Sequence, residues 1–240
     1  MIYKKVIASP EHRLLVVGDI HGRYDLLQKA IAQLNIKAED TFLSVGDLID
    51  RGPNSKECLD YFLTQPNRHF IIGNHEQMML DRNLHSDFMD NWLYNGGKET
   101  QQQLGDEVDL YCEHIERNAP YILEVQYGEY KYGLIHAEVP FEQDGSETIW
   151  NNVIKRATID PMYQEKLIWN REVIEAAFNP QRRQAIRNIN GVDQVIHGHT
   201  PIPVPMIESN RIWIDTLYGG TQSITVAFVE NGNWAYHSIS

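Results

Sequence analysis

Three short apolar runs, each leading into a glycine and then into polar side chains, constrain the fold of this chain most. Asp19, Asp47 and Asn74 directly follow these glycines and lie 28 and 27 residues apart. That interval is the length of a strand, a crossover helix and the next strand. Right-handed crossovers make such strands parallel and bring the loops at their carboxyl ends to one edge of the sheet. We therefore expect three polar loops to converge. The runs that we interpret as strands are residues 13–18, 41–46 and 68–72.

The rest of the pattern predicts two packed sheets covered by helices, in one α/β domain over residues 1–240. Apolar spacing predicts a helix after each of the first two strands, and Gly96 and Gly105 divide a helical insertion over about 76–120. A hairpin is expected around Gly128. We expect parallel strands first and antiparallel strands later. The later helices are predicted at 76–84, 86–94, 98–104, 107–118 and 147–156, and the later strands at 121–125, 130–135, 194–196, 203–208, 211–216, 222–229 and 233–238.

Composition and charge limit the classes of function. A hydrophobic fraction of 42% and a charged fraction of 22% are ordinary for a soluble globular protein of 240 residues. A formal net charge of -12 argues against a nucleic-acid partner, because binding a phosphate backbone needs a basic face. Cys58 and Cys112 lack metal-site spacing, so we expect free thiols in a reducing compartment. Without a signal peptide or a membrane-length apolar run, the sequence predicts a cytoplasmic protein with no membrane partner.

Six polar residues that follow apolar strand-like runs form a candidate set of metal ligands. Carboxylate, amide and imidazole ligands together favour Mn, Fe or Zn over Ca or Mg, because imidazole is a poor ligand for hard cations. Six ligands with a carboxylate able to bridge favour two cations, and we expect Asp47 to be the bridge. Each histidine by itself is more often structural than a ligand, but six coincidences disfavour that interpretation. The six residues are Asp19, His21, Asp47, Asn74, His136 and His199.

Residues 46–52 pack two acids and an arginine into the loop at the end of the second strand. Asp47 and Asp50 lie three residues apart, and Arg51 follows directly. One carboxylate can ligate a metal while the other orients a base, and the guanidinium can bind a phosphate or a carboxylate with two hydrogen bonds. Taken alone, this stretch is explained equally well by a solvated acidic turn.

Three motifs in this order resemble the signatures of the calcineurin-like metallophosphoesterases. More narrowly, the chain resembles the phosphoprotein phosphatase branch, and within it the lambda-type phage and bacterial serine/threonine protein phosphatases. The match extends from about residue 13 to residue 220. The motifs are Gly18-Asp19-Ile20-His21-Gly22, Gly46-Asp47-Leu48-Ile49-Asp50-Arg51-Gly52 and Gly73-Asn74-His75-Glu76, followed by Asn95-Gly96-Gly97, Trp169-Asn170-Arg171-Glu172 and Gly198-His199-Thr200-Pro201.

The resemblance implies a four-layer α-β-β-α sandwich with two divalent cations, Mn first and Fe or Zn as alternatives. It implies that water activated by the two metals attacks a phosphoserine or phosphothreonine, and also phosphotyrosine, in protein substrates. His75 would be the general acid, Asp50 its orienting partner, and Arg51 and Arg171 the phosphate clamps, with Asn74 also contacting substrate. The first metal would be held by Asp19, His21 and Asp47, and the second by Asp47, Asn74, His136 and His199.

Three positions depart from the family pattern or leave alternatives open. Ile72 stands where the family usually has an arginine. His197 lies two residues before His199 and is a candidate for a supporting or buried residue rather than a ligand. Arg171 is assigned from a short motif, and three later arginines compete with it, although a solvated helix face explains those more simply. The competing arginines are Arg182, Arg183 and Arg187.

Two rival functions remain open at the level of sequence. A symmetrical dinucleoside tetraphosphate hydrolase shares this scaffold, but that family has a non-acidic residue in place of Asp50 and an aspartate in place of Glu76. A catalytically inactive binding scaffold would require a missing ligand or acid, and none is missing. The acidic net charge disfavours a nuclease.

Overall fold

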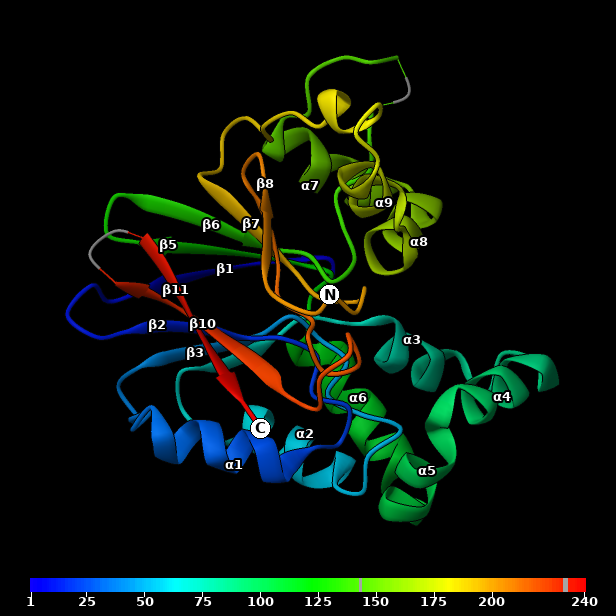
Figure 1. The fold of residues 1–240 in the computed structure, drawn as a ribbon. Coiled ribbons are helices and arrows are strands. Elements are labelled where there is room, and N and C mark those ends of the chain that lie inside the picture. Colours follow the sequence, from blue (N-terminus) through cyan, green and yellow to red (C-terminus); the bar gives the residue numbers. More distant parts are fainter. Residues whose placement is uncertain (143, 231–232) are drawn as a thin grey trace.

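Two β-sheets packed face to face occupy the middle of the molecule, and helices cover their outer faces (Figure 1). The computed structural model describes residues 1–142, 144–230 and 233–240. The predicted α-β-β-α order of layers is confirmed, because one apolar cluster lies between the sheets and others lie between each sheet and its helices.

The first sheet is built on the three apolar runs at the start of the chain. Its strands and crossover helices are β2 (Leu14–Val17), α1 (Tyr24–Gln33), β3 (Thr41–Ser44), α2 (Ser55–Thr64), β4 (Arg68–Phe70), β10 (Ile224–Glu230) and β11 (Asn233–Ile239). β2, β3 and β4 are parallel neighbours, as predicted. β10 pairs antiparallel with β2, and β11 pairs antiparallel with β10. The strand order is β11-β10-β2-β3-β4.

The continuous apolar character of β2 follows from burial on both of its faces. Leu14 and Val16 belong to the cluster between the sheets, whereas Leu15 and Val17 belong to the cluster under the helices. Successive side chains of a strand point to opposite faces, so a strand covered on both sides needs apolar residues at every position. Such a strand delivers its terminal loop rigidly to the sheet edge.

The second sheet contains the predicted hairpin and is mixed. Its strands, in the order of the sheet, are β1 (Tyr3–Ala8), β5 (Ile122–Tyr127), β6 (Tyr130–Leu134), β7 (Gln194–His197), β9 (Arg211–Trp213) and β8 (Met206–Glu208). β5 and β6 form the antiparallel hairpin, and β8 pairs antiparallel with β9. However, β7 runs parallel to both β6 and β9, and β1 runs parallel to β5. The expectation of antiparallel later strands was therefore wrong for these pairs.

The parallel pairing of β6 with β7 has a physical cause in the helices between them. They are α7 (Trp150–Ile159), α8 (Pro161–Trp169) and α9 (Glu172–Phe178), followed by a short 3-10 turn at Arg183–Ala185. Together they form a crossover, which returns the chain in the same direction. The sequence predicted only α7 among these helices. The predicted range, 147–156, begins three residues before the observed first residue of α7, Trp150. β1 was not predicted either, because Lys4 and Lys5 interrupt the apolar pattern of this edge strand.

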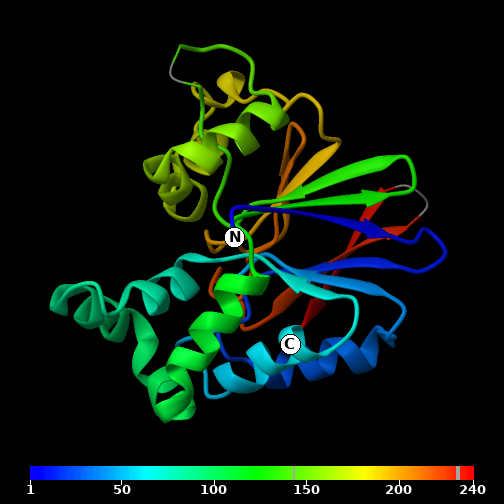
Figure 2. The ribbon, with the colours of Figure 1, turned by 180° about the vertical axis from the view of Figure 1, so that it is seen from behind.

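A helical segment follows β4 and extends beside the carboxyl edge of the first sheet (Figure 1). Its elements are α3 (Asn74–Asp81), α4 (Ser86–Trp92), a π-helical turn (Leu93–Gly97), α5 (Lys98–Leu104), a 3-10 turn (Gly105–Glu107) and α6 (Val108–Asn118). The breaks at Gly96 and Gly105 agree with the prediction, and both residues have positive φ. Figure 2 shows α6, in green, on the same side of the sheets as α1 and α2.

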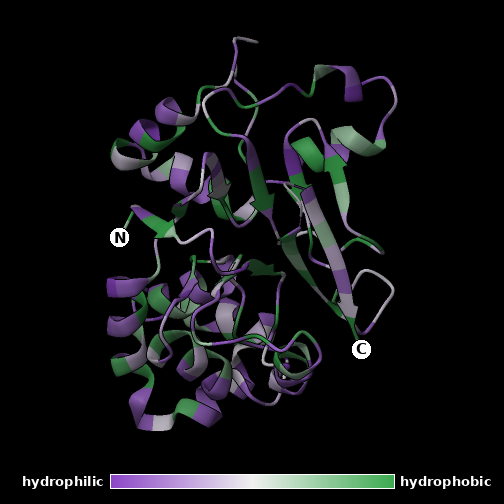
Figure 3. Cartoon of the chain, turned by 90° about the vertical axis from the view of Figure 1, so that its left-hand side faces the viewer, coloured by the Kyte–Doolittle hydropathy of each residue, from purple (hydrophilic) through white to green (hydrophobic). Residues whose placement is uncertain are grey.

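The buried strands are mainly apolar, whereas the helices carry both apolar and polar residues (Figure 3). Met78, Met79 and Trp92 are buried in the core. Cys58 and Cys112 are both buried free thiols, as predicted. Within the described parts of the chain, no helix combines the length and apolar character that a membrane crossing requires.

Candidate metal centre

The loops after β2, β3 and β4 meet at one edge of the first sheet, as the spacing of the motifs predicted. The backbone N–H groups of Ile20 and His21 donate to the carbonyl oxygen of Asp47 at 3.1 and 2.8 Å. The backbone N–H of His75 donates to Asp47 Oδ1 at 3.0 Å. Asp47 thus joins all three loops through its own backbone and side chain.

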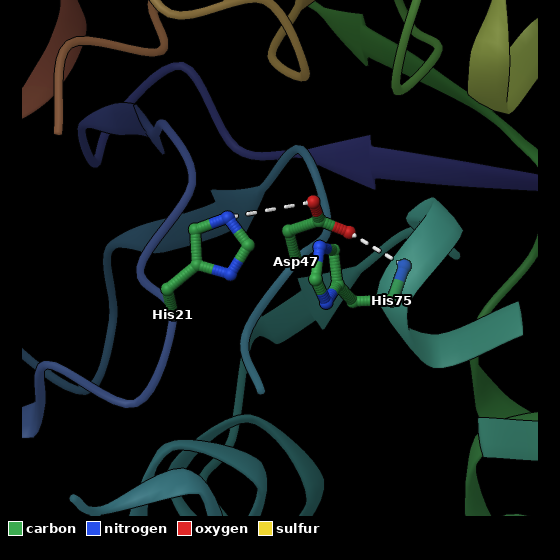
Figure 4. A group of neighbouring side chains, drawn as sticks. All are labelled: His21, Asp47 and His75. Carbon is green, nitrogen blue, oxygen red and sulfur yellow. Dashed lines mark hydrogen bonds and ion pairs between the residues drawn. The ribbon is translucent and has the colours of Figure 1, made fainter. Parts of the chain in front are cut away.

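The carboxylate of Asp47 lies between the side chains of His21 and His75 (Figure 4). Its Oδ2 atom is 3.6 Å from Nε2 of His21 and 3.4 Å from Nε2 of His136. Asp47 belongs to one set of mutually close donor atoms with His21 and His75, and to a second set with Asp19 and His136. A carboxylate shared by two donor sets suits a ligand between two cations, but these sets group Asp19 with His136 rather than with His21.

Asn74, His136 and His199 bring three further donors to the same place. Oδ1 of Asn74 is 3.0 Å from Nε2 of His136 and 2.8 Å from Nδ1 of His199. Nδ1 of His136 is 2.7 Å from the carbonyl oxygen of Val45, so it donates its proton there and leaves Nε2 as the free donor atom. His136 follows β6 and His199 follows β7, so the second sheet completes a centre that the first sheet begins.

Two glycines in the motifs make room for the carboxylates. A Cβ atom on Gly73 would lie 2.1 Å from Oδ1 of Asp47, and one on Gly198 would lie 2.0 Å from Oδ1 of Asp19. The backbone N–H of His199 donates to both oxygens of Asp19, at 3.2 and 3.0 Å. These glycines are therefore required by the close approach of one loop to the acid of another.

The backbone is strained at this centre. Eight non-glycine residues in the described parts of the chain have positive φ, and five of them are candidate site residues. Left-handed conformations cost roughly 1–3 kcal/mol each and persist where the surrounding structure holds them, often at functional sites. The five are His21 (44°), Asp47 (51°), Asp50 (72°), Arg51 (66°) and His199 (67°).

Three buried carboxyl groups concentrate negative charge here. Burial, followed by the charges of Asp215 and Asp47, raises the pKa of Asp19 well above its usual value. Burial raises the pKa of Asp215 to about 6. Burial also opposes ionisation of Asp47, but the neighbouring imidazole groups of His136 and His75 hold the pKa of Asp47 well below its usual value. Bound cations would relieve the repulsion among these acids, so charge and donor chemistry both fit a metal centre.

His75, which belongs to the first donor set, forms a buried pair with Asp50. Nδ1 of His75 is 2.7 Å from Oδ2 of Asp50, and both side chains are buried. Asp50 also accepts from the hydroxyl of Thr100 at 2.6 Å and from the indole N–H of Trp92 at 3.1 Å. The carboxylate is thereby fixed from α4 and α5, and it fixes the imidazole in turn. The sequence indicated the pair but not Trp92 or Thr100, which come from the helical segment.

Arg51 reaches over the centre from its rim. Its Nη1 is 2.8 Å from Nε2 of His21, and its Nη2 is 2.9 Å from Nε2 of His75. The guanidinium carbon lies 5.6 Å from the ring centre of Tyr218, which is 40% exposed. Tyr218 was not among the candidates, because it comes from a loop near the end of the chain with no motif of its own.

Arg171 is exposed at the start of α9. The pKa of His199 is lowered to about 2, mainly by burial, and the charge of Arg171 contributes to this lowering. Arg171 is therefore close enough to the centre to act electrostatically. The competing Arg182 and Arg183 each pair with a surface glutamate, at 3.4 and 2.5 Å. A solvated surface explains these two, as expected.

His197 is buried and belongs to neither donor set. Its Nδ1 is 2.8 Å from the carbonyl oxygen of Ile135, and its ring lies 5.2 Å from that of Trp213. Burial lowers its pKa to about 3, so the ring is neutral. Its surroundings are those of a buried residue beneath the centre.

Two glutamates support the centre and were given no role by the sequence analysis. Glu76 accepts from the backbone N–H groups of Gly73, Asp47 and Leu48 at 2.8–2.9 Å, and so joins the second and third loops. A glutamate three residues after the residue preceding a helix is a capping-box signal that could have identified it. Glu138 accepts from Asn170 and from the first backbone N–H groups of α9, beside Arg171.

The chain is similar in sequence and in fold to known proteins. The family model described as calcineurin-like phosphoesterase matches residues 12–203. Serine/threonine-protein phosphatase 2 of Escherichia coli (strain K12) is 34% identical over 221 residues, which cover 89% of this chain and 91% of that protein. A symmetrical bis(5'-nucleosyl)-tetraphosphatase of Actinobacillus pleuropneumoniae serotype 5b is 34% identical over 145 residues, but these cover 56% and 48%. A solved protein serine/threonine phosphatase from Saccharomyces cerevisiae has the same fold, with a TM-score of 0.67 at 15% identity over all of this chain and 83% of that one.

Proposed function

The chain belongs to the calcineurin-like phosphoesterase family, and from this premise we propose that it is a metal-dependent protein phosphatase. Its substrates would be phosphoserine and phosphothreonine in proteins, and phosphotyrosine as well. The observation that carries the proposal is the carboxylate of Asp47, which is common to two donor sets, one of which contains His75 of the buried His75–Asp50 pair. The protein phosphatase relative also matches over nearly its whole length, whereas the tetraphosphatase matches over about half.

Two divalent cations fit the donor set, with Mn as the first choice and Fe or Zn as alternatives. When bound, they would lower the pKa of a water molecule and neutralise charge on the phosphoryl oxygens. The residues that would hold them are Asp19, His21 and Asp47 for one cation, and Asp47, Asn74, His136 and His199 for the other.

The protein's own groups would bind and orient the phosphoryl group. Arg51 and Arg171 carry guanidinium groups near the rim of the centre. Each guanidinium can donate two hydrogen bonds to phosphoryl oxygens. Asn74 would contribute a polar contact from the start of α3. Burial of the ligands keeps the dielectric low, so these contacts would be stronger than in water.

His75 would supply the proton for the leaving oxygen. Its Nδ1–H is engaged by Asp50, so Nε2 is the atom that can carry a proton to the substrate. Water would attack phosphorus opposite the serine or threonine oxygen, and the bond from phosphorus to that oxygen would break as His75 protonates it. Inorganic phosphate and the free hydroxyl result, and no phosphorylated side chain is needed.

The test is phosphate release by the Mn-reconstituted protein from a phosphoserine protein and from a dinucleoside tetraphosphate, each with and without a chelator. Chelator-sensitive turnover of the phosphoprotein supports the proposal. Preference for the dinucleotide would overturn the substrate class, which the partial tetraphosphatase match makes the second candidate. Turnover of neither substrate would instead favour an inactive scaffold.

Two further expectations belong to the same proposal. We place the whole activity in one catalytic domain over residues 1–240, because ligands come from both sheets. We also place the protein in the cytoplasm, since both of its cysteines are unpaired, as is usual in a reducing compartment.

A further inference from the structure

Arg51 contacts two atoms that the proposed reaction needs for other purposes. Its two terminal nitrogens lie 2.8 Å from Nε2 of His21 and 2.9 Å from Nε2 of His75. The two imidazole rings meet edge to face, with 4.7 Å between their centres. One guanidinium therefore spans a candidate metal ligand and the candidate general acid.

The direction of these hydrogen bonds follows from the contact that the other ring nitrogen, Nδ1, makes in each histidine. Nδ1 of His21 is 3.0 Å from the carbonyl oxygen of Ile49, and Nδ1 of His75 is 2.7 Å from Asp50. Both Nδ1 atoms therefore donate, and both Nε2 atoms offer only a lone pair. A guanidinium has donors and no acceptor, so Arg51 donates to both lone pairs.

The lone pair on Nε2 of His21 cannot accept from Arg51 and ligate a cation at the same time. Nδ1 cannot replace it, because it is committed to Ile49. Nε2 is also the nitrogen that faces the carboxylate of Asp47, at 3.6 Å. Cation binding at His21 therefore requires the guanidinium of Arg51 to leave.

The surroundings of Arg51 allow its end to move while its base stays fixed. Its backbone N–H donates to the carbonyl oxygen of Gly96 at 3.1 Å. Gly96 has no side chain, which leaves room for the aliphatic part of Arg51, because a Cβ atom on residue 96 would lie 2.8 Å from Cγ of Arg51. Arg51 is exposed, whereas His21 and His75 are buried. The guanidinium can therefore swing toward solvent, along the half-exposed ring of Tyr218.

We propose that Arg51 is a latch on the metal centre, which a divalent cation must displace from His21. Displacement frees the guanidinium to bind the phosphoryl group and frees Nε2 of His75 to carry its proton. One event would thus prepare the metal ligand, the phosphate clamp and the acid together. The inference rests on the proposed metal centre and adds a competition that the proposed function does not require.

The decisive experiment is Mn²⁺ titration of the metal-stripped protein by calorimetry, comparing the native chain with Arg51→Met. Methionine keeps the apolar stem and removes every donor. Losing a hydrogen bond that competes with the cation should tighten the first Mn²⁺ about tenfold. The matched control is Arg171→Met, which removes a charge near His199 without removing a bond to any candidate ligand.

The competition predicts that Arg51→Met tightens Mn²⁺ binding at least several-fold more than Arg171→Met does. If Mn²⁺ binding tightens equally in both variants, the effect is due to charge alone and the latch is overturned. Unchanged or weaker Mn²⁺ binding in Arg51→Met would also overturn the latch. If the native chain binds no Mn²⁺, the metal centre fails and the latch fails with it. If the native chain binds Mn²⁺ but Arg51→Met shows no gain, only the latch fails.

A second readout follows the position of Arg51 itself. Modification of arginines by phenylglyoxal, quantified by peptide mass spectrometry, should become several-fold faster at Arg51 when Mn²⁺ is added. Arg183 is the internal reference, because it pairs with Glu208 away from the centre. An Arg51 rate that Mn²⁺ leaves unchanged relative to Arg183 would contradict the displacement.

Discussion

Each histidine at this centre is defined by the nitrogen that is already engaged. His21, His75 and His136 all use Nδ1 for a hydrogen bond, to Ile49, Asp50 and Val45 respectively. Each ring therefore presents Nε2 to the site in one fixed orientation. The partner differs with the proposed role: it is a carbonyl oxygen for the candidate ligands His21 and His136, and a carboxylate for the candidate acid His75.

Replacing His75 tests this assignment at the level of one residue. His75→Asn should lower kcat on a phosphoprotein by roughly 10²–10⁴, because the leaving oxygen loses its proton donor. Bound Mn should stay at the native stoichiometry, since the ligands remain. Steady-state kinetics and elemental analysis of the same preparation provide the measurement. Near-native turnover, or a loss of metal, would refute the role of acid.

At the scale of elements, the ends of the strands determine the site. The loops after β2 and β3 each contain a glycine that is followed by residues with left-handed backbone conformations, whereas the glycine after β4 leads directly into α3. The glycine before α3 is needed because the carboxylate of Asp47 occupies the space that a side chain would take. The glycines in these motifs are therefore needed because one loop packs closely on another.

A methyl group at Gly73 should displace Asp47 and empty the centre. Gly73→Ala would place Cβ 2.1 Å from Oδ1 of Asp47, so we expect bound Mn to fall by at least half and activity to fall with it. Gly105→Ala is the control: its positive φ of 51° costs roughly 1–3 kcal/mol, but no atom lies within 4 Å of the new Cβ. Elemental analysis and thermal unfolding separate the two effects. Full metal content in Gly73→Ala would contradict the steric argument.

Glu138 makes the start of α9 sensitive to pH. Burial raises the pKa of Glu138 from 4.5 to about 7. Between these values the folded protein keeps a proton that the unfolded chain has lost, so the free energy of unfolding falls as pH rises from 4.5 toward 7, by at most about 3 kcal/mol. Glu138→Gln should flatten this part of the stability profile, measured by urea unfolding at several pH values.

The control for this pH dependence is Glu175→Gln, a change at an exposed position of α9, the helix whose start Glu138 contacts. It should retain the native slope between pH 4.5 and pH 7. Equal slopes in Glu138→Gln, the control and the native protein would show that the Glu138 carboxyl does not hold its proton in the folded state.

At the scale of the whole molecule, the centre joins the two sheets. Asp19, Asp47 and Asn74 follow strands of the first sheet, whereas His136 and His199 follow strands of the second. Cations held by this set would bind only the folded protein, because the donors are brought together by the packing of both sheets. Metal binding should therefore stabilise the complete fold rather than one loop.

Removing the metal should lower the unfolding temperature of the complete protein. A cation at 100 times its Kd stabilises by about 2.7 kcal/mol, which corresponds to about 5–10 °C for a chain of this length. Scanning calorimetry with Mn²⁺ and with a chelator measures the difference, and Asp47→Asn should show none. An equal unfolding temperature for the native protein in both conditions would contradict metal binding at a site shared by the sheets.

The sequence by itself determined the three parallel strands of the first sheet, the crossover helices between them and the six candidate ligands. These features depend on short-range patterns: an apolar run buried on both faces, a glycine, and a polar side chain at the strand end. The repeat of about 28 residues added the only long-range information, because it matches one βαβ unit. The convergence of His21, Asp47 and Asn74 followed from that spacing.

Only the tertiary structure decided the direction of the later strands, the place of β1 and the positions of α8 and α9. These depend on pairings between distant segments, such as Tyr3 with Ile122, which no local pattern specifies. The same is true of the contacts that tune the centre, including Glu76 on Asp47 and Arg51 on His21. Apolar periodicity shows which residues are buried, but packing decides which buried polar atoms meet, and at this centre those meetings set the chemistry.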